Sequence, residues 1–295
     1  MDYPMISGFA DEICPGFADQ LRAITRMGMH YICIRSANGK NIAAFTPEEA
    51  ERELLPDLQA FSVKVSSLGS PIGKISVEDE AAFETQLVQL ENLCKICHLL
   101  DCQYIRIFSF YPPQGKDPYD YQSIVIKKLK AFVKLAEKYG VILIHENEKD
   151  IFGDIGERCA LIFRQIDSPY LKAAYDFANF VQCMEDPMAC WEALKPYTVY
   201  IHIKDALFSN RENVLAGTGD GQILPILKDA FENQGYHGFL TLEPHLFAFI
   251  NLKDLEKGNP NDVALKNRYP SGEEAYEAQY QALLDMLHKI SPKEE

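Results

Sequence analysis

The sequence has no apolar run near the length of a membrane span, and it is poor in basic residues relative to acidic ones. A bilayer crossing needs about 20 consecutive apolar residues. The 29 Lys and Arg against 43 Asp and Glu give a net charge of −14, whereas nucleic-acid backbones are bound mainly by clustered basic side chains. We therefore expect neither a membrane nor a nucleic-acid partner. Residues 1–4 do not begin the basic segment followed by an apolar run that is typical of a secretory signal. We therefore expect a cytoplasmic protein.

Cysteine is also sparse, with eight residues in a chain of 295. The segment Cys94-Lys95-Ile96-Cys97-His98 matches the C-x-x-C-H pattern of covalent haem attachment. We reject that interpretation because the segment lies in a helical pattern over 78–99, where Phe83, Cys94 and Cys97 share one apolar face. The cysteines are therefore predicted to be reduced, mostly buried thiols.

The composition, 47% hydrophobic and 24% charged, is that of an ordinary globular protein. Short β-rich runs alternate with amphipathic helical stretches, which is typical of βα units around a parallel sheet. We predict strands at Ile6–Phe9, Tyr31–Arg35, Lys64–Leu68, Tyr104–Phe108, Val141–Glu146, Leu171–Asp176, Val199–Ile203 and Phe239–Glu243. We predict helices near 16–27, 47–60, 78–99, 118–138, 154–166, 185–194, 222–234 and 271–289.

Eight such units favour one closed (β/α)8 TIM barrel spanning residues 1–295 as a single domain. No stretch rich in Pro, Gly and Ser divides the chain. A doubly wound sheet is the alternative, but it would usually have a glycine-rich loop after its first strand. Phe9-Ala10-Asp11-Glu12 supplies acids there instead. A long loop, about 244–270, follows the eighth strand and is expected to be a lid, a subunit contact or the place of a short helix.

Polar residues end the last four predicted strands. Glu146, Asp176, His202 and Glu243 are separated by 30, 26 and 41 residues, each about one βα unit. The carboxyl ends of barrel strands form the active-site face, so we expect these side chains to converge. Three carboxylates and an imidazole at one point require a cation between them. Mostly oxygen ligands with one histidine favour Mn²⁺ or Mg²⁺, with Co²⁺ or Zn²⁺ as alternatives.

Several of these motifs resemble the xylose isomerase-like barrel superfamily, and within it the sugar phosphate isomerase/epimerase group that includes ketose 3-epimerases. The matching segments are Glu146-Asn147, Asp176, His202-Ile203-Lys204-Asp205, Gly217-Thr218-Gly219-Asp220-Gly221 and Leu242-Glu243-Pro244. The resemblance implies one Mn²⁺ or Co²⁺ on the four matching ligands. It also implies that Glu146 and Glu243 are the catalytic acid/base pair, removing and returning a proton next to a substrate carbonyl from opposite faces.

Further polar residues at strand ends are candidates for substrate binding. These are Lys204, Arg35, Arg106, His245 and Glu148. Lys204 lies on the same side of its strand as His202, with an ion pair to Asp205, Glu148 or Glu12 as the alternative. His145 points away from the side of Glu146 and is expected to pack or to support a ligand. The backbone N–H groups of 217–221 are a further candidate for binding an oxygen atom.

Four functions compete on this evidence. The first is a divalent-metal-dependent isomerase or epimerase of a small sugar, polyol or sugar phosphate, acting through an enediolate. The second is a dehydratase of the inosose or dehydroshikimate type at the same site. The third is a DNA-repair endonuclease, which the net charge and the seven histidines oppose. The fourth is a non-catalytic metabolite-binding barrel. The oligomeric state, including a homo-oligomer, is left open.

Overall fold

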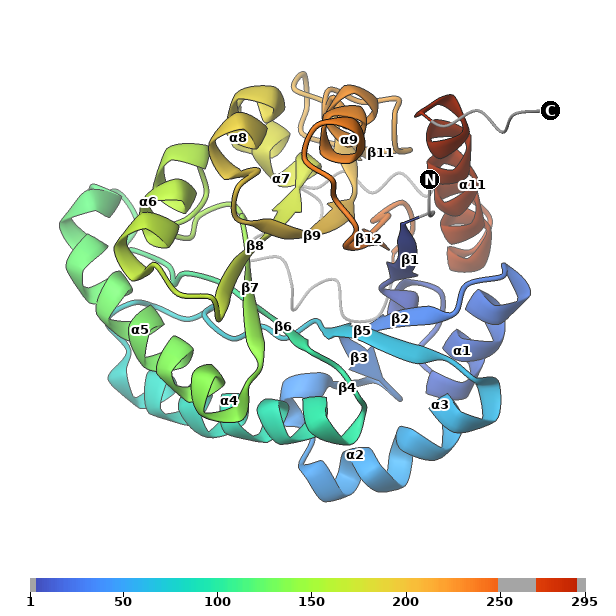
Figure 1. The fold of residues 1–295 in the computed structure, drawn as a ribbon, viewed down its shortest axis with the longest axis horizontal. Coiled ribbons are helices and arrows are strands. Elements are labelled where there is room, and N and C mark those ends of the chain that lie inside the picture. Colours follow the sequence, from blue (N-terminus) through green and yellow to red (C-terminus); the bar gives the residue numbers. More distant parts are fainter. Residues whose placement is uncertain (1–3, 249–268, 291–295) are drawn as a thin grey trace.

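The computed structural model of the protein describes residues 4–248 and 269–290, and its centre is a parallel eight-stranded sheet curled into a barrel (Figure 1). In chain order the strands are β1 (Met5–Gly8), β2 (Tyr31–Ile34), β5 (Lys64–Leu68), β6 (Tyr104–Ile107), β7 (Ile142–Glu146), β8 (Leu171–Asp176), β9 (Thr198–Ile203) and β12 (Phe239–Leu242). They pair in the order β1-β12-β9-β8-β7-β6-β5-β2. The ends of this order, β1 and β2, pack against each other and nearly close the barrel. The predicted TIM-barrel fold is confirmed.

Helices surround the barrel on its outer side (Figure 1). The longer ones are α1 (Phe17–Arg26), α4 (Glu80–Leu99), α5 (Gln122–Tyr139), α6 (Gly156–Ile166), α8 (Pro187–Leu194), α9 (Ile223–Glu232) and α11 (Gly272–Ile290). Their inner faces and the outward-facing strand residues form one continuous apolar core. No helix in the described part of the chain combines the length and apolar character that a bilayer crossing requires.

The predicted helix over 47–60 is wrong as a single element. The structure has α2 (Pro47–Glu53) followed by α3 (Leu55–Phe61). Pro56 has no backbone N–H, so the hydrogen bond that would continue the first helix cannot form. The start is as the sequence predicts: Thr46 caps α2, and Glu49 returns a bond to the Thr46 backbone in a reciprocal capping box.

Several short elements escape the sequence pattern. They are α7 (Phe177–Gln182), the hairpin strands β3 (Ser36–Ala37) and β4 (Lys40–Asn41), the hairpin strands β10 (Asp205–Ala206) and β11 (Asn213–Val214), and the 3₁₀ turns η1 (Ala10–Glu12) and η2 (Ile42–Ala44). The first turn of the helix predicted over 118–138 is a 3₁₀ turn, η3 (Pro118–Tyr121), which leads directly into α5. α7, both hairpins, η1 and η2 lie in the connections that follow barrel strands. Most of the long connection predicted at 244–270 lies outside the described residues.

Small hydroxyl side chains fill part of the barrel interior. Ser66 Oγ lies 2.6 Å from Ser7 Oγ and 2.9 Å from the hydroxyl of Tyr200. Ser67 donates to the same tyrosine oxygen at 2.8 Å. The Tyr200 ring lies edge-on to His202, with ring centres 5.6 Å apart. The barrel interior next to the carboxyl ends of the strands is therefore filled by packed side chains.

Candidate metal and active site

The four residues predicted as metal ligands come from four strands that are neighbours in the barrel. Glu146 and Asp176 end β7 and β8, His202 is the penultimate residue of β9, and Glu243 directly follows β12. Asp176 pairs in register with His202, while Glu146 pairs with Ala174, two residues earlier on β8. This stagger is the normal consequence of strand tilt in a closed barrel. It lets residues of different register meet at one height.

The four side chains converge on one buried point. His202 Nδ1 lies 3.1 Å from Glu146 Oε1, 3.3 Å from Glu243 Oε2 and 4.0 Å from Asp176 Oδ2. One ligand atom from each residue lies within 4.8 Å of all the others. The structure thus brings together all four residues selected at strand ends.

The donor atoms fit a divalent cation. Asp176 Oδ2, Glu243 Oε2 and both ring nitrogens of His202 are buried and have no hydrogen-bond partner among the described residues. The short distances between them are therefore charge contacts without hydrogen-bond geometry. Buried polar atoms without partners are costly, and a cation between them removes that cost. Three carboxylates and one imidazole suit Mn²⁺ or Mg²⁺, with Co²⁺ and Zn²⁺ also acceptable.

The charges of the cluster shift the acid–base equilibria of its members. Burial raises the pKa of Glu146, but His202 and Arg106 outweigh burial and hold it at about 2. Burial lowers the pKa of His202, yet Glu146 and Glu243 raise it to about 9. Burial raises the pKa of Asp176 to about 7, although Lys204 opposes the shift. The imidazole therefore carries a proton at neutral pH when no metal ion is bound.

Arg106, on β6, fixes the outer oxygen of Glu146. Its Nη1 donates to Glu146 Oε2 at 3.0 Å, its Nη2 to the carbonyl of Gly69 at 3.1 Å and its Nε to the carbonyl of Ser70 at 3.3 Å. Three of its donor groups are thus committed within the protein. The sequence predicted a substrate contact for Arg106, which stays a prediction; the geometry makes it a support of Glu146.

Arg35, directly after β2, has a comparable relation to Glu243. Its Nη1 donates to Glu243 Oε1 at 3.0 Å. The rest of the guanidinium binds the Asp11 carboxylate through two bonds of 2.9 Å and contacts Glu12 at 3.3 Å. Bidentate arginine–carboxylate pairs hold both partners in one plane. A substrate contact by Arg35 also remains a prediction, since the described geometry places it among three carboxylates.

One phenyl ring lies beneath both guanidinium groups. The Phe9 ring centre is 4.6 Å from Cζ of Arg35 and 4.9 Å from Cζ of Arg106, and the Phe108 ring lies 5.0 Å from the latter. Phe9 also meets His202 edge-on at 5.2 Å. Aromatic faces attract cations at these separations. Phe9 therefore connects the supports of both glutamates with the histidine.

Lys204 and Glu148, two further predicted substrate-binding residues, differ in their distance from the cluster. Lys204 Nζ lies 3.1 Å from Asp176 Oδ2 and 3.6 Å from Glu243 Oε2. The ion pairs of Lys204 are therefore not with the partners that the sequence suggested, which were Asp205, Glu148 or Glu12. Glu148 accepts a hydrogen bond from Lys74 Nζ at 2.8 Å, and Lys74 holds its pKa low against the effect of burial.

The two histidines next to the glutamates point to different environments. His245 Nε2 lies 3.4 Å from both Glu12 Oε1 and Glu243 Oε1, and its backbone N–H donates to Glu12. It therefore lies beside the cluster, and its proposed role in substrate binding stays a prediction. His145 packs edge-on against Phe163, at 6.1 Å, and burial lowers its pKa to about 4. It is a neutral packing residue.

Two asparagines support the cluster and were not predicted as site residues. Asn179 donates from its backbone to Asp176 Oδ1 at 2.8 Å and from its side chain to Glu146 Oε1 at 3.3 Å. Asn147 exchanges two hydrogen bonds with the backbone of Asp176. Asn147 directly follows Glu146 at the end of β7, so its position at a strand end is a signal that the sequence offers. Asn179 lies in α7, which no sequence pattern predicted.

The glycine-rich segment 217–221 does not offer its N–H groups to a ligand. Gly217 and Gly219 donate to Asp205 Oδ2 at 2.9 and 3.0 Å, and Gly221 donates to Asp205 Oδ1 at 2.9 Å. The expected oxygen atom is thus one of the protein's own carboxylates. A Cβ atom on Gly219 would lie 2.4 Å from Asp205 Oδ1. Glycine is required here because the backbone approaches the carboxylate so closely.

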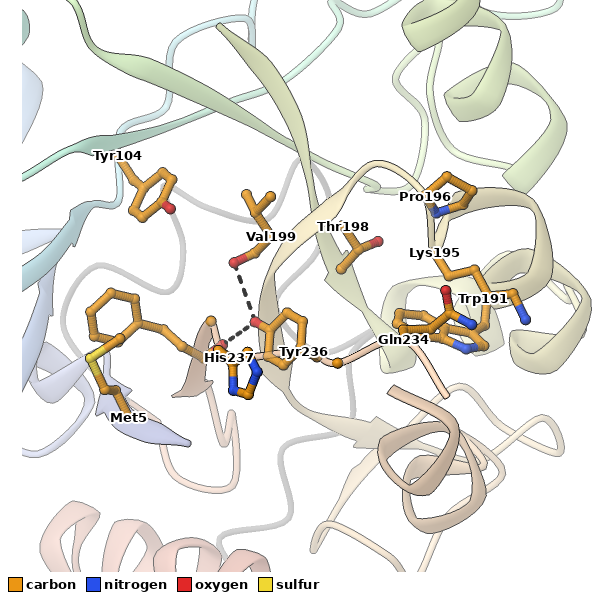
Figure 2. A pocket seen from close by; sticks show the side chains of 13 residues that line it. Met5, Tyr104, Trp191, Lys195, Pro196, Thr198, Val199, Gln234, Tyr236 and His237 are labelled. Atoms are coloured by element: carbon orange, nitrogen blue, oxygen red, sulfur yellow. Dashed lines mark hydrogen bonds between the residues drawn. The ribbon is translucent and has the colours of Figure 1, made fainter. Parts of the chain in front are cut away.

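A separate cavity of about 510 Å³ opens at the opposite, amino end of the barrel (Figure 2). Met5, Tyr104, Thr198 and Phe239, the first residues of four strands, lie in its wall. The hydroxyl of Tyr236 donates to the Phe239 carbonyl at 2.7 Å. Active sites of TIM barrels lie at the carboxyl ends of the strands, so this cavity is not the candidate catalytic site.

Comparisons with known proteins agree with this architecture. The family model of the xylose isomerase-like TIM barrel matches residues 21–289. D-allulose 3-epimerase from Methylomonas sp. has a TM-score of 0.73 at 13% identity, with 96% of this chain and 98% of that one covered. The IOLI protein with a bound zinc atom has a TM-score of 0.74 at 16% identity, with 98% of this chain and 99% of that one covered.

A third similar structure is a probable 3-DHS dehydratase, AsbF, from Bacillus anthracis. It has a TM-score of 0.66 at 14% identity, with 95% of this chain and 98% of that one covered. At these identities the likeness of the three structures shows the fold alone. No curated protein matches the chain.

Proposed function

Because the chain belongs to the xylose isomerase-like TIM barrel family, we propose that it is a divalent-metal-dependent isomerase or epimerase of a small sugar or sugar phosphate. The observation that carries the proposal is the convergence of Glu146, Asp176, His202 and Glu243, one ligand atom from each lying within 4.8 Å of the others in a buried site. Mn²⁺ is the first expectation for the ion, with Mg²⁺, Co²⁺ or Zn²⁺ as alternatives; a similar structure contains zinc.

The two glutamates are proposed as the groups that move the proton. They come from β7 and from the end of β12, which lie on either side of β8 and β9 in the sheet. Their carboxylates thus approach the centre of the cluster from two sides. A carboxylate on each face of a substrate carbon removes the proton on one face and returns it on the other, inverting that carbon. The divalent ion supplies a Lewis acid that stabilises negative charge on substrate oxygen.

Lys204, Arg35, Arg106, His245 and Glu148 remain the proposed substrate-binding set. Lys204 and His245 each lie within 4.0 Å of Glu243, whereas the two arginines hold the glutamates of the cluster by directed hydrogen bonds. An ammonium and an imidazole give hydrogen-bond donors for hydroxyl or carbonyl oxygens. The two arginines act on such a substrate through the glutamates that they hold.

A dehydratase is the second candidate, since a similar structure is a probable 3-DHS dehydratase. Loss of water β to a carbonyl starts with the same proton abstraction, so the ligand cluster serves both reactions. The mass of the product separates them, because a dehydratase product is lighter by one water and an isomerase product is unchanged. A binding protein without activity would hold a metal ion yet exchange no proton from any ketose.

The first test is metal content by elemental mass spectrometry on protein purified without chelators. We expect about one Mn, Co, Mg or Zn per chain, lost in Glu243→Ala. A panel of ketoses and ketose phosphates in D₂O then reports deuterium uptake. Glu146→Gln and Glu243→Gln should abolish uptake, while Glu192→Gln, at a surface pair with Lys195, should retain it. An active, metal-replete Glu243→Gln variant would refute the acid/base role, and a metal-free wild type after loading would refute the site.

A further inference from the structure

Lys204 brings a positive charge to the same oxygen atoms that form the ligand cluster. It follows β9, two residues after His202, and its side chain is 4% exposed. Its Nζ lies 3.1 Å from Asp176 Oδ2 and 3.6 Å from Glu243 Oε2. These are the two oxygens nearest to His202 in their carboxylates. A lysine ammonium therefore faces two of the four ligand atoms.

We propose that Lys204 competes with the divalent ion for Asp176 and Glu243, and so keeps the bound ion weakly held and exchangeable. The inference rests on the proposed metal site. The ammonium balances part of the negative charge of the two carboxylates in the metal-free protein. When the same oxygens bind an ion, the ammonium is left next to a like charge, and the repulsion lowers the affinity.

The geometry at Asp176 explains why the two cations compete for one atom. Oδ1 of Asp176 accepts the backbone N–H of Asn179 at 2.8 Å, which leaves Oδ2 for any cation. Oδ2 has no hydrogen-bond partner among the described residues even though Lys204 is 3.1 Å away. The contact is one of charge only, so an ion at Oδ2 breaks no directed bond.

The two arginines do not share this conflict. Arg106 donates to Oε2 of Glu146, whereas His202 faces Oε1. Arg35 donates to Oε1 of Glu243, whereas His202 faces Oε2. Each guanidinium thus occupies the oxygen turned away from the histidine, which is compatible with an ion on the other oxygen. Among the described lysines and arginines, Lys204 is the one that contacts the carboxylate oxygens facing His202.

The test compares Lys204→Met, which removes the charge with little change in length, with Lys204→Arg, which keeps it. Lys74→Met is the matched control, because Lys74 is a lysine with a side chain only 10% exposed, paired with Glu148 at 2.8 Å rather than with a ligand oxygen. The probe is Mn²⁺, replaced by Mg²⁺, Co²⁺ or Zn²⁺ where the wild type does not bind Mn²⁺. Its Kd is measured by calorimetry at one pH, and its release rate by chelator chase.

We expect Lys204→Met to bind Mn²⁺ at least about tenfold more tightly and to release it more slowly. Lys204→Arg and Lys74→Met should stay near the wild type. A Kd in Lys204→Met equal to or weaker than the wild type, with the wild type binding normally, overturns this inference and leaves the proposed function standing. Failure of every protein to bind Mn²⁺, Mg²⁺, Co²⁺ or Zn²⁺ overturns both. If Lys204→Met folds poorly, Lys204→Gln gives the same comparison.

Discussion

Nη1 of Arg106 lies 3.0 Å from Oε2 of Glu146, and both side chains are buried. The other donors of the guanidinium bind the carbonyls of Gly69 and Ser70, so the group that holds the glutamate is itself fixed. Glu146 is left with Oε1 facing His202. The orientation of a proposed catalytic carboxylate is therefore set from the neighbouring strand β6.

Replacement of Arg106 by methionine is expected to destabilise the protein strongly. Loss of one partner from a buried ion pair leaves an uncompensated charge, which costs about 3 kcal/mol or more. Urea denaturation of the metal-free protein measures the change. The double variant Arg106→Met with Glu146→Gln should recover part of the loss, because no buried charge is left alone.

The control for this prediction is a surface pair. Arg22 and Asp19 form an ion pair in which both side chains are more than half exposed. Arg22→Met should cost less than about 1 kcal/mol. A loss of the same small size in Arg106→Met would show that its guanidinium does not stabilise Glu146.

The alternation of strands and helices could be predicted because each barrel strand is a short apolar run and each long helix has a periodic apolar face. All eight predicted strands occur with ends shifted by a residue or so. The misses have local causes. Pro56 divides one predicted helix, and α7 has only six residues and begins directly after its cap, Asp176. Hairpin strands of two residues carry no periodic pattern to detect.

The ligand cluster could be predicted because the carboxyl ends of barrel strands meet on one face. The same rule, applied to β1, leads to Asp11 and Glu12, whose partnership with Arg35 the sequence analysis did not foresee. What the rule cannot give is which oxygen of a carboxylate meets which cation. The pairing of each oxygen with its cation depends on side-chain rotamers and on strand stagger, which a pattern of residue types along the chain does not reveal.

Metal affinity is expected to rise with pH. The glutamates hold the pKa of His202 at about 9 in the metal-free protein, against the effect of burial, while ligation requires the neutral ring. Binding therefore releases a proton from His202 below pH 9, and the affinity should change about tenfold per pH unit. Below pH 7, Asp176 adds a second proton, since burial raises its pKa to about 7.

Calorimetry in two buffers with different ionisation enthalpies counts these protons. The stability of the metal-free protein should change with pH in the opposite direction to the metal affinity, falling as pH rises. Because the pKa of His202 is raised by folding, its contribution to stability is complete below about pH 6.5 and is lost as pH rises through about 9. His98→Gln, at a histidine on α4 bonded to the Tyr139 carbonyl, is the control. Binding without proton release at pH 7.5 would contradict the assignment of His202.

Asp205 should matter more for stability than its position in the two-residue strand β10 suggests. Its carboxylate accepts backbone N–H groups from Ala206 and from Gly217, Gly219 and Gly221. Asparagine has one acceptor oxygen and turns an NH₂ group toward two of these donors. We expect Asp205→Asn to cost about 3 kcal/mol in urea denaturation.

Hydrogen exchange localises the effect. The amides of Gly217, Gly219 and Gly221 should exchange faster in Asp205→Asn, while those of the distant helix α5 change little. Thr218→Ala is the control, because this exposed side chain donates to the Leu215 carbonyl and not to Asp205. Unchanged exchange in the glycine segment would mean that the carboxylate does not order it.

The cysteines are expected to fall into two reactive classes. Burial raises the pKa of Cys33, of Cys94 and of Cys190 to about 12, and raises that of Cys97 well above its usual range. Thiolates are the reactive species, so these groups should react with iodoacetamide at pH 8 about a thousandfold more slowly than a free thiol. Cys14, which is only partly buried, should be labelled first, whereas burial also raises the pKa of Cys183 far above its usual range and places it in the slow class.

Mass spectrometry after brief labelling of the native protein gives the order, and labelling in guanidinium chloride must modify all eight. Cys94 and Cys97 are the most informative residues in this experiment, because they belong to the C-x-x-C-H match. Their Sγ atoms lie on the buried face of α4, whereas His98 is exposed. Rapid labelling of either in the native state would mean that α4 does not pack as described, and would reopen the segment as a site for a bound group.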